Sequence, residues 1–380
     1  MGILAGDDTL MGLIGAADNF DEPTPQINKP GTILGLCISF TIMAWICVGF
    51  RLYVRLGVIK TPGWDDLFVV LSLVWFSAHG GVVLLINRVG LGQHLLLLGM
   101  DRASAFLHSF YVLNATYVMS TALIKISLLL QYMRIYQRGV LLYNVCRALI
   151  AFIALWGVAY AVIAWVPCVP VSDYWEIIYA QDTSNMHCYG YGSQSVAVFK
   201  ATYESHAAVN MLLDLVVMAL PIPLYFEQGA RGRTKLGLVG IIAMGTVVNI
   251  FSVWRFATTI EHQAATYPTF DPTWYGPVSI VMAGLEIASA CICASVPVFW
   301  GPMLGTASQL LGQIFVTKEV HVTTEHRFED LESNDTLHLR TRGTMMGMEE
   351  RAQLGDQAAS PLQWTSKDGG VHEHSKSWSR

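Results

Sequence analysis

Residues 31–54 read GTILGLCISFTIMAWICVGFRLYV, an apolar stretch whose only charged side chain is Arg51. A helix needs about 20 mostly apolar residues to cross the hydrocarbon core of a bilayer, so this stretch is long enough to do so. Comparable stretches recur along the chain with short polar loops between them. We therefore predict seven transmembrane helices, at residues 31–54, 65–87, 105–132, 145–167, 201–226, 236–259 and 276–300.

The composition agrees with an all-α, polytopic membrane protein. Of the 380 residues, 53% are hydrophobic and 13% are charged, whereas soluble domains contain about 25% charged residues. The net charge is −5 and no dense cluster of lysine and arginine occurs, which argues against nucleic acid as a partner. Membrane lipid is the expected surrounding of the helices.

The distribution of basic residues predicts the orientation in the membrane. Short loops on one side carry Arg51, Arg55, Lys60, Arg134, Arg138, Arg147, Arg231, Arg233 and Lys235, and the opposite side has only Lys29, Arg88, Arg102 and Lys200. Cytosolic loops carry the excess of positive charge, so the N-terminus is expected outside. The chain then divides into a short outer N-terminus (1–30), a seven-helix domain (31–302) and a cytosolic tail (303–380), whose polar composition predicts disorder.

Two of the seven cysteines, Cys168 and Cys188, fall in the outer loop before the fifth span. This location is oxidising, so we predict a disulfide between them, with two free thiols as the alternative. Closing a loop of about 20 residues stabilises a fold by roughly 3 kcal/mol in the chain-entropy estimate.

Several local patterns follow one another in a fixed order. They are Arg51-Leu-Tyr-Val-Arg55, Gly63-Trp-Asp-Asp66, Gly90-Leu-Gly-Gln-His94, Lys125-Ile-Ser127, Cys168-Val-Pro170, Pro221-Ile-Pro223 and Asp271-Pro-Thr273, together with Asp214, Arg255, Glu286 and Pro297. Over roughly residues 35–305 this set resembles the fungal integral membrane family labelled rhodopsin domain. That family includes Pth-type receptor-like proteins and membrane proteins of secondary-metabolite clusters. The resemblance implies a seven-helix, receptor-like fold.

The family label does not imply a light sensor. A retinal Schiff base needs a lysine on the last helix, and residues 276–300 contain none. We therefore expect no retinal and no other cofactor. The histidines show no tight ligand spacing such as His-x-x-x-His, so no metal site is predicted either.

Ionisable and polar residues inside the spans are candidates for function, because they are costly in a bilayer and face the interior of a bundle. His206, Asn210 and Asp214 recur every fourth residue and form one polar stripe on the fifth span. Asn114 and Lys125 share a face of the third span, and Glu286 lies on the seventh. The pattern predicts a polar cavity between these three spans, in which Lys125 pairs with Asp214 or with Glu286. Ion pairs that fix helix register, a binding pocket and acid–base catalysis are the alternative roles.

Four charged residues near the cytosolic side and two near the outer side are interpreted as structural. Asp65 and Asp66 open the second span, where they complement the helix N-terminus and can pair with Arg51 or Arg55. Arg255 and Asp271 flank the outer end of the sixth span and the following loop. A salt bridge between them at the lip of the bundle is expected.

The leading functional hypothesis is a receptor-like sensor that binds a small amphipathic molecule from outside and acts on a cytosolic signalling partner. Its expected location is the plasma membrane. The alternative is a membrane-embedded, cyclase-like enzyme of secondary metabolism that uses the buried carboxylates on a lipophilic substrate, which suits an endomembrane. A transporter is disfavoured because the seven spans show no internal repeat.

Overall fold

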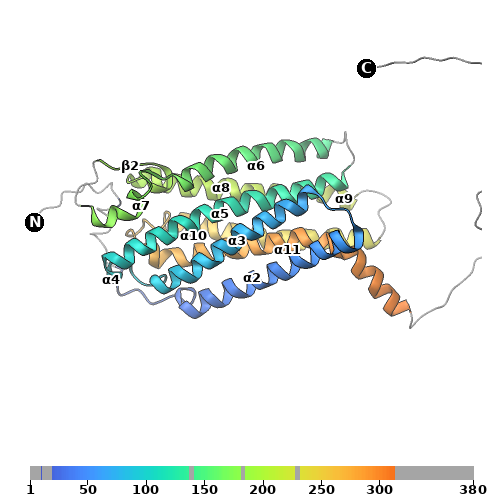
Figure 1. The fold of residues 1–380 in the computed structure, drawn as a ribbon, viewed down its shortest axis with the longest axis horizontal. Helices are drawn as coiled ribbons and strands as arrows, with labels where there is room; N and C mark the ends of the chain where they lie inside the picture. Colours follow the sequence, from blue (N-terminus) through green and yellow to red (C-terminus); the bar gives the residue numbers. More distant parts are fainter. Residues whose placement is uncertain (1–9, 11–18, 137–140, 181–184, 227–231, 313–380) are drawn as a thin grey trace, which may run out of the picture. The chain divides into compact units, whose positions relative to one another are not determined.

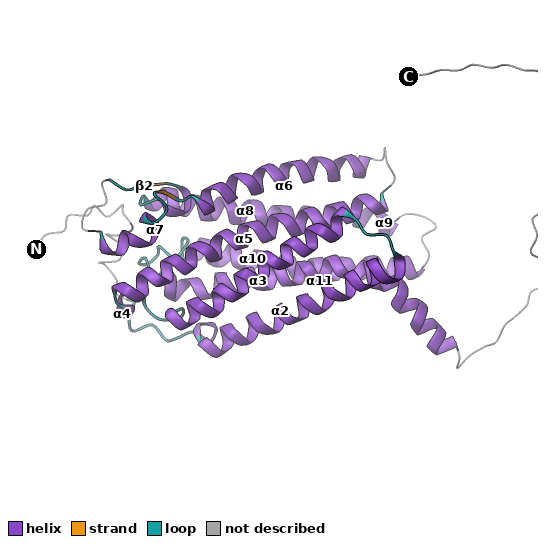
Figure 2. Cartoon of the chain, viewed as in Figure 1, coloured by secondary structure: helices purple, strands orange, loops and turns teal. Residues whose placement is uncertain are grey.

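The computed structural model describes residue 10 and residues 19–136, 141–180, 185–226 and 232–312. Long helices dominate this part of the chain (Figures 1 and 2). They are α2 (Pro30–Tyr53), α3 (Trp64–Val89), α5 (Met100–Ile135), α6 (Leu141–Trp165), α8 (Val196–Ala219), α10 (Gly232–Glu261) and α11 (Pro272–Gly312). A π-helical turn, η2 (Val54–Ile59), continues α2.

The short elements lie between the long helices. They are η1 (Gln26–Asn28), α4 (Leu95–Leu98), β1 (Cys168–Val169), α7 (Asp173–Glu176), η3 (Ile177–Tyr179), β2 (His187–Cys188), η4 (Gly190–Gly192) and α9 (Ile222–Phe226). In Figure 1, α4, α7 and β2 gather at one end of the bundle and α9 lies at the other. We call the end with α4, α7 and β2 the outer end, after the orientation predicted from the basic residues, and the opposite end the cytosolic end.

The long helices form a bundle whose outside is apolar. The central helices are α5 and α11, in whose most apolar windows 78% and 83% of residues are buried, against 17% for α2 and 28% for α6. Large hydrophobic side chains, such as Ile46 on α2 and Leu155 on α6, are exposed on the peripheral helices. Such a surface suits lipid rather than water.

Six of the described helices are long and apolar enough to cross a membrane. The other long helix, α8, has 24 residues and packs against α10 and α5 in the same bundle. Its polar stripe lowers its hydropathy, although it is as long as its neighbours. The chain is thus a multi-pass, all-helical membrane protein, as predicted.

Two prolines, Pro221 and Pro297, differ in their effect on helix length. The predicted fifth span extended to residue 226, but α8 ends at Ala219, just before Pro221, and α9 follows as a separate short helix. By contrast, α11 runs through Pro297 to Gly312, and Figure 1 shows it bending in its C-terminal part. The expected tail at 303–380 therefore begins within a helix, and residues 313–380 lie outside the described part.

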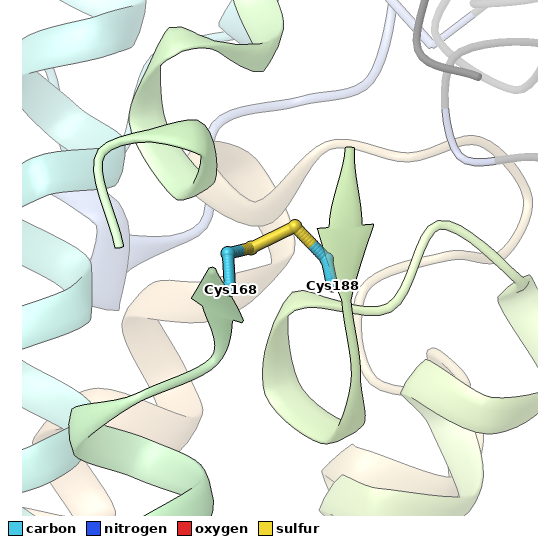
Figure 3. Close-up of a disulfide and its surroundings, with 2 residues drawn as sticks. All are labelled: Cys168 and Cys188. Carbon is cyan, nitrogen blue, oxygen red and sulfur yellow. A yellow bond between two sulfur atoms is a disulfide. The ribbon is translucent and has the colours of Figure 1, made fainter. Parts of the chain in front are cut away.

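The predicted disulfide is present at the outer end. Cys168 and Cys188 face each other in the antiparallel pair of β1 and β2 and are bonded (Figure 3). Their bond ties the segment after α6 to the segment before α8. The loop between these helices is thereby held over the outer end of the bundle.

Candidate functional site

Two ion pairs form the polar centre of the bundle. Lys125 of α5 lies 2.8 Å from Asp214 of α8 (Nζ to Oδ1), and Arg255 of α10 lies 3.1 Å from Glu286 of α11 (Nε to Oε2). Asn210 joins them: its amide nitrogen lies 3.2 Å from Asp214 and 2.8 Å from Glu286, and its oxygen accepts from Lys125 at 2.9 Å. All five side chains are buried.

The polar stripe of α8 explains how this centre forms. Residues four apart lie on one helical face, so His206, Asn210 and Asp214 all point into the bundle and are buried. The side chains that Asn210 and Asp214 contact come from α5, α10 and α11. Together with the two ion pairs, these contacts link the three helices to α8. A buried carboxylate left without its cation destabilises a protein by about 3–5 kcal/mol, so the two pairs help to fix how these helices pack.

The structure supports the sequence-based pairing only in part. Lys125 pairs with Asp214, which was one of the two predicted arrangements, and Glu286 pairs instead with Arg255. Helix α10 was missing from the predicted cavity, yet it supplies Arg255 and also Ser252, whose hydroxyl donates to Asp214 at 3.0 Å. The sequence signal for the part played by α10 is Arg255 itself, an arginine in the predicted sixth span. From the sequence it is expected at the outer lip, whereas the structure places it inside the bundle.

A cavity opens toward the outer end from this centre. Its free volume is about 110 Å³. Polar residues that line it are His79, Asn114, Tyr117, Tyr191, Tyr203, His206, Arg255, Thr258, Thr259, His262, Tyr275 and Ser279, and apolar lining residues include Phe110, Leu113, Phe199, Ile280 and Ala283. Lys125, Asn210, Asp214 and Glu286 are not among the described lining residues. Of the candidate residues, Asn114 and His206 therefore border the cavity, and the other four lie behind it.

Aromatic rings surround the inner part of the cavity. The His206 ring stacks on Trp156, with ring centres 4.8 Å apart, and meets Tyr160 edge-on at the same separation. The guanidinium of Arg255 lies over the Tyr117 ring, 5.0 Å from its centre. A cation over an aromatic face is stabilised by about 0.5–2 kcal/mol.

Several buried polar atoms at the cavity have no hydrogen-bond partner among the described residues. They are His79 Nε2, His206 Nε2, Arg255 Nη2 and the Tyr191 hydroxyl. Burial raises the pKa of Tyr191 well above its usual range, so this phenol stays protonated and able to donate. Unpaired buried polar groups are rare in proteins, and their grouping around one cavity makes this cavity the candidate site.

The cytosolic end holds the predicted pairing of Asp65 and Asp66 with Arg51 and Arg55, which we call the cytosolic clamp. The Arg51 guanidinium is fully buried and lies 2.5 Å from Asp65 and 2.9 Å from Asp66. Arg55 approaches the same two carboxylates at 3.5 and 3.8 Å, and Arg134 of α5 adds a third cation 2.9 Å from Asp65. The pairing of Arg51 and Arg55 with these acids is confirmed.

The clamp also reaches two other helices. Arg51 donates to the side chain of Gln131 on α5 at 3.0 Å and to the backbone carbonyl of Ala294 on α11. Four helices, α2, α3, α5 and α11, therefore meet at one arginine.

The predicted lip bridge between Arg255 and Asp271 was wrong. Arg255 lies deeper and pairs with Glu286, whereas Asp271 lies 2.9 Å from His94 Nδ1 and accepts the backbone N–H of Leu95 at 3.1 Å. Because Asp271 immediately precedes α11, its carboxylate also accepts the N–H of Trp274 at 3.2 Å, as a helix-capping group does. Asp271 thus caps α11 and contacts His94 and Leu95 rather than Arg255.

An N-terminal strap, residues 19–22 together with Leu10, lies across the same end. Asn19 donates to Asp271 at 3.0 Å, and Glu22 accepts from Trp274 Nε1 at 2.9 Å and from the Tyr275 hydroxyl at 2.8 Å. Leu10 is buried and its N–H bonds to the backbone of Gln194. Tyr275 lines the cavity, so the strap contacts the cavity wall directly.

Comparison with known proteins gives the family. The family profile described as Fungal rhodopsin domain matches residues 50–304. The chain is similar to a SAT4 family membrane protein of Emericella nidulans, 25% identical over 264 residues that make up 68% of this chain and 59% of that protein. It is also similar to the polyenoic acids biosynthesis gene cluster protein Ba17b of Metarhizium anisopliae, 23% identical over 268 residues, 67% of this chain and 69% of that protein.

The chain thus spans less than two thirds of the length of the first of these relatives. The family match covers most of the chain, from the end of α2 into α11, and includes both ion pairs and the cytosolic clamp. The protein belongs to the fungal rhodopsin domain family of multi-pass membrane proteins.

Proposed function

We propose that this protein is a receptor-like sensor that binds a small amphipathic molecule in the outer cavity. The observation that carries this proposal is the group of buried polar atoms without partners around an aromatic-lined cavity. Ligand sites in proteins are concave and mostly apolar, with a few polar groups that fix orientation. A retinal Schiff base is not part of this proposal, because α11 contains no lysine to form one.

A physical route connects the cavity with the cytosolic end. Arg255 borders the cavity and is paired with Glu286 on α11. Eight residues further along the same helix, about 12 Å at 1.5 Å per residue, the carbonyl of Ala294 accepts from Arg51 of the clamp. A ligand that moves Arg255 therefore acts on a rigid helix whose other part contacts the clamp, and a cytosolic partner would detect the change there. The plasma membrane is the location that suits this role.

An enzyme of secondary metabolism is the second candidate. One relative is named for a polyenoic acid biosynthesis cluster, and Asp214 and Glu286 are carboxylates in the bundle. However, each carboxylate is paired with a cation, and neither is among the described residues that line the cavity. Catalysis by these acids would need the bundle to open, so the geometry favours binding.

Complementation of a deletion strain separates the two functions. Wild type, Asp214→Asn and Glu286→Gln are compared, together with Leu212→Ala, a control on the exposed face of α8. We expect the two network variants to insert into the membrane, with the level of each checked by immunoblot, and to lose the response to an external compound, with an unchanged metabolite profile. Accumulation of one intermediate, reversed by wild type and by Leu212→Ala only, would replace the sensor with the enzyme.

A further inference from the structure

The charges beside the cavity are already balanced. Lys125 is paired with Asp214, and Arg255 with Glu286, so the centre carries two cations and two anions. A charged ligand would bring an uncompensated charge into a buried site, which is strongly unfavourable. The electrostatics therefore select an uncharged ligand.

The hydrogen bonding of His79 indicates one chemical group that a ligand in the cavity must carry. Its Nδ1 lies 3.3 Å from the backbone carbonyl of Leu113, and a carbonyl only accepts, so Nδ1 carries the proton. The ring is 2% exposed and packs against the rings of Phe76 and Tyr117, with no carboxylate partner among the described residues, which favours its neutral form. Nε2 is then an acceptor without a partner among the described residues, and a hydroxyl group is the simplest donor that an uncharged, largely apolar molecule supplies.

Arg255 indicates a second group on the ligand, which must be a hydrogen-bond acceptor. Its Nε is bound to Glu286, while Nη2 is a buried donor without a partner among the described residues. Arg255 and His79 both lie against the Tyr117 ring, at 5.0 Å and 6.3 Å from its centre. Both residues also line the same cavity, so one small molecule can reach an acceptor and a donor beside the same ring.

The remaining walls are apolar and include Phe110, Phe199 and Ile280. We propose that the ligand is an uncharged, largely apolar molecule with a hydroxyl group that donates to His79 and a carbonyl or ether oxygen that accepts from Arg255. This inference rests on the ligand-binding function proposed above. It adds the charge and the hydrogen-bonding groups of the ligand.

Native mass spectrometry of the full-length protein in lipid nanodiscs tests the ligand class. Three equimolar probe mixtures of matched size are used: neutral hydroxyphenyl ketones and lactones, the corresponding phenylalkanoic acids, and phenylalkylamines. Each hydroxyphenyl compound is accompanied by its analogue without the hydroxyl group. We expect the neutral hydroxylated probes to be retained about 10- to 100-fold more than their deoxy analogues, the effect of leaving one buried group unpaired.

Two variants assign the contacts. In His79→Asn the amide nitrogen can take the place of Nδ1 and keep the bond to Leu113, while the Nε2 acceptor is lost; the preference for hydroxylated probes should disappear. Arg255→Lys keeps a cation for Glu286, but all its N–H groups are on one nitrogen and nothing replaces Nη2 at its position, so retention of carbonyl probes should fall by a similar factor. Thr246→Val, on an exposed position of α10, serves as the control.

The outcomes are distinguishable. Preferential retention of the acids or amines would overturn the uncharged ligand while leaving a ligand-binding sensor in place. Retention of the neutral probes with no effect of His79→Asn or Arg255→Lys in folded protein would overturn the assigned contacts. If no mixture is retained by wild type, the proposed function fails as well.

Discussion

At the scale of single residues, Arg51 is the most constrained charge that the structure describes. It is fully buried, and its partners are two carboxylates, an amide oxygen and a backbone carbonyl from three other helices. Arginine suits this place because its planar guanidinium presents five donors in a fixed geometry. Removal of Arg51 takes the nearest cation away from two buried carboxylates.

Replacing Arg51 with methionine should therefore be strongly destabilising. We expect Arg51→Met to lower the free energy of unfolding by about 3–5 kcal/mol. Arg55→Met is the matched control: Arg55 is 14% exposed and its contacts with the same acids are longer, so a loss below about 1 kcal/mol is expected. Thermal unfolding of both variants in the same detergent measures the difference, and equal losses would contradict the special role of Arg51.

Ion pairs could be predicted from the sequence where a short loop keeps the two partners close together. Asp65 and Asp66 follow Arg51 and Arg55 across one short loop, so few arrangements keep them apart, and the pairing was predictable. Arg255 was different: its helix face follows from periodicity, but its depth relative to α11 depends on tilt and packing. The sequence therefore left its true partner, Glu286, undetermined.

At the scale of elements, α5 and α6 approach closely at a glycine. A Cβ added to Gly157 of α6 would lie 2.8 Å from the Cβ of Ala122 on α5, whereas one added to Gly81 of α3 would meet nothing within 4 Å. Gly157→Ala should separate the two helices and destabilise the bundle by about 1–3 kcal/mol. Gly81→Ala should be neutral or stabilising by up to about 1 kcal/mol, because alanine is the better helix former. Thermal unfolding of the two variants side by side would reject this account if they behave alike.

The disulfide constrains a second pair of elements. Cys188→Ser should lower the free energy of unfolding by roughly 3 kcal/mol in the chain-entropy estimate, because the segment between α6 and α8 loses its link. Cys37→Ser, at a free cysteine of α2, is the control and should have little effect. Dithiothreitol should lower the unfolding temperature of wild type and of Cys37→Ser but not that of Cys188→Ser; a reagent effect on all three proteins would point to another cause.

Proline alone did not fix the element boundaries. Pro221 stands just beyond the end of α8, and the helix stops there, because proline lacks the N–H that a continuing helix needs. Pro297 stands inside α11, which continues to Gly312 and bends in its C-terminal part (Figure 1). The same residue type thus lies beyond the end of one helix and within another.

At the scale of the whole molecule, the ends of the bundle differ in charge and in covalent chemistry. Arg51, Arg55 and Arg134 gather at the cytosolic end, and the disulfide lies at the outer end. Both features indicate an N-terminus outside the cytosol. An epitope tag before Met1 should be detected by antibody on intact cells expressing the protein at the surface, and a tag after Arg380 only after permeabilisation. The reverse pattern would invert the orientation and place the cavity on the cytosolic side.

The N-terminal strap has a consequence for the biosynthesis of the protein. Asn19 binds Asp271, which follows it by 252 residues, and a ribosome adds about 5–20 residues per second. The strap is therefore synthesised roughly 10–50 s before its docking site exists. During this interval Asn19 and Glu22 have none of the partners that they contact around the start of α11. Docking of the strap is thus one of the last events of assembly, and a chain that stops short of Asp271 would leave both side chains without these partners.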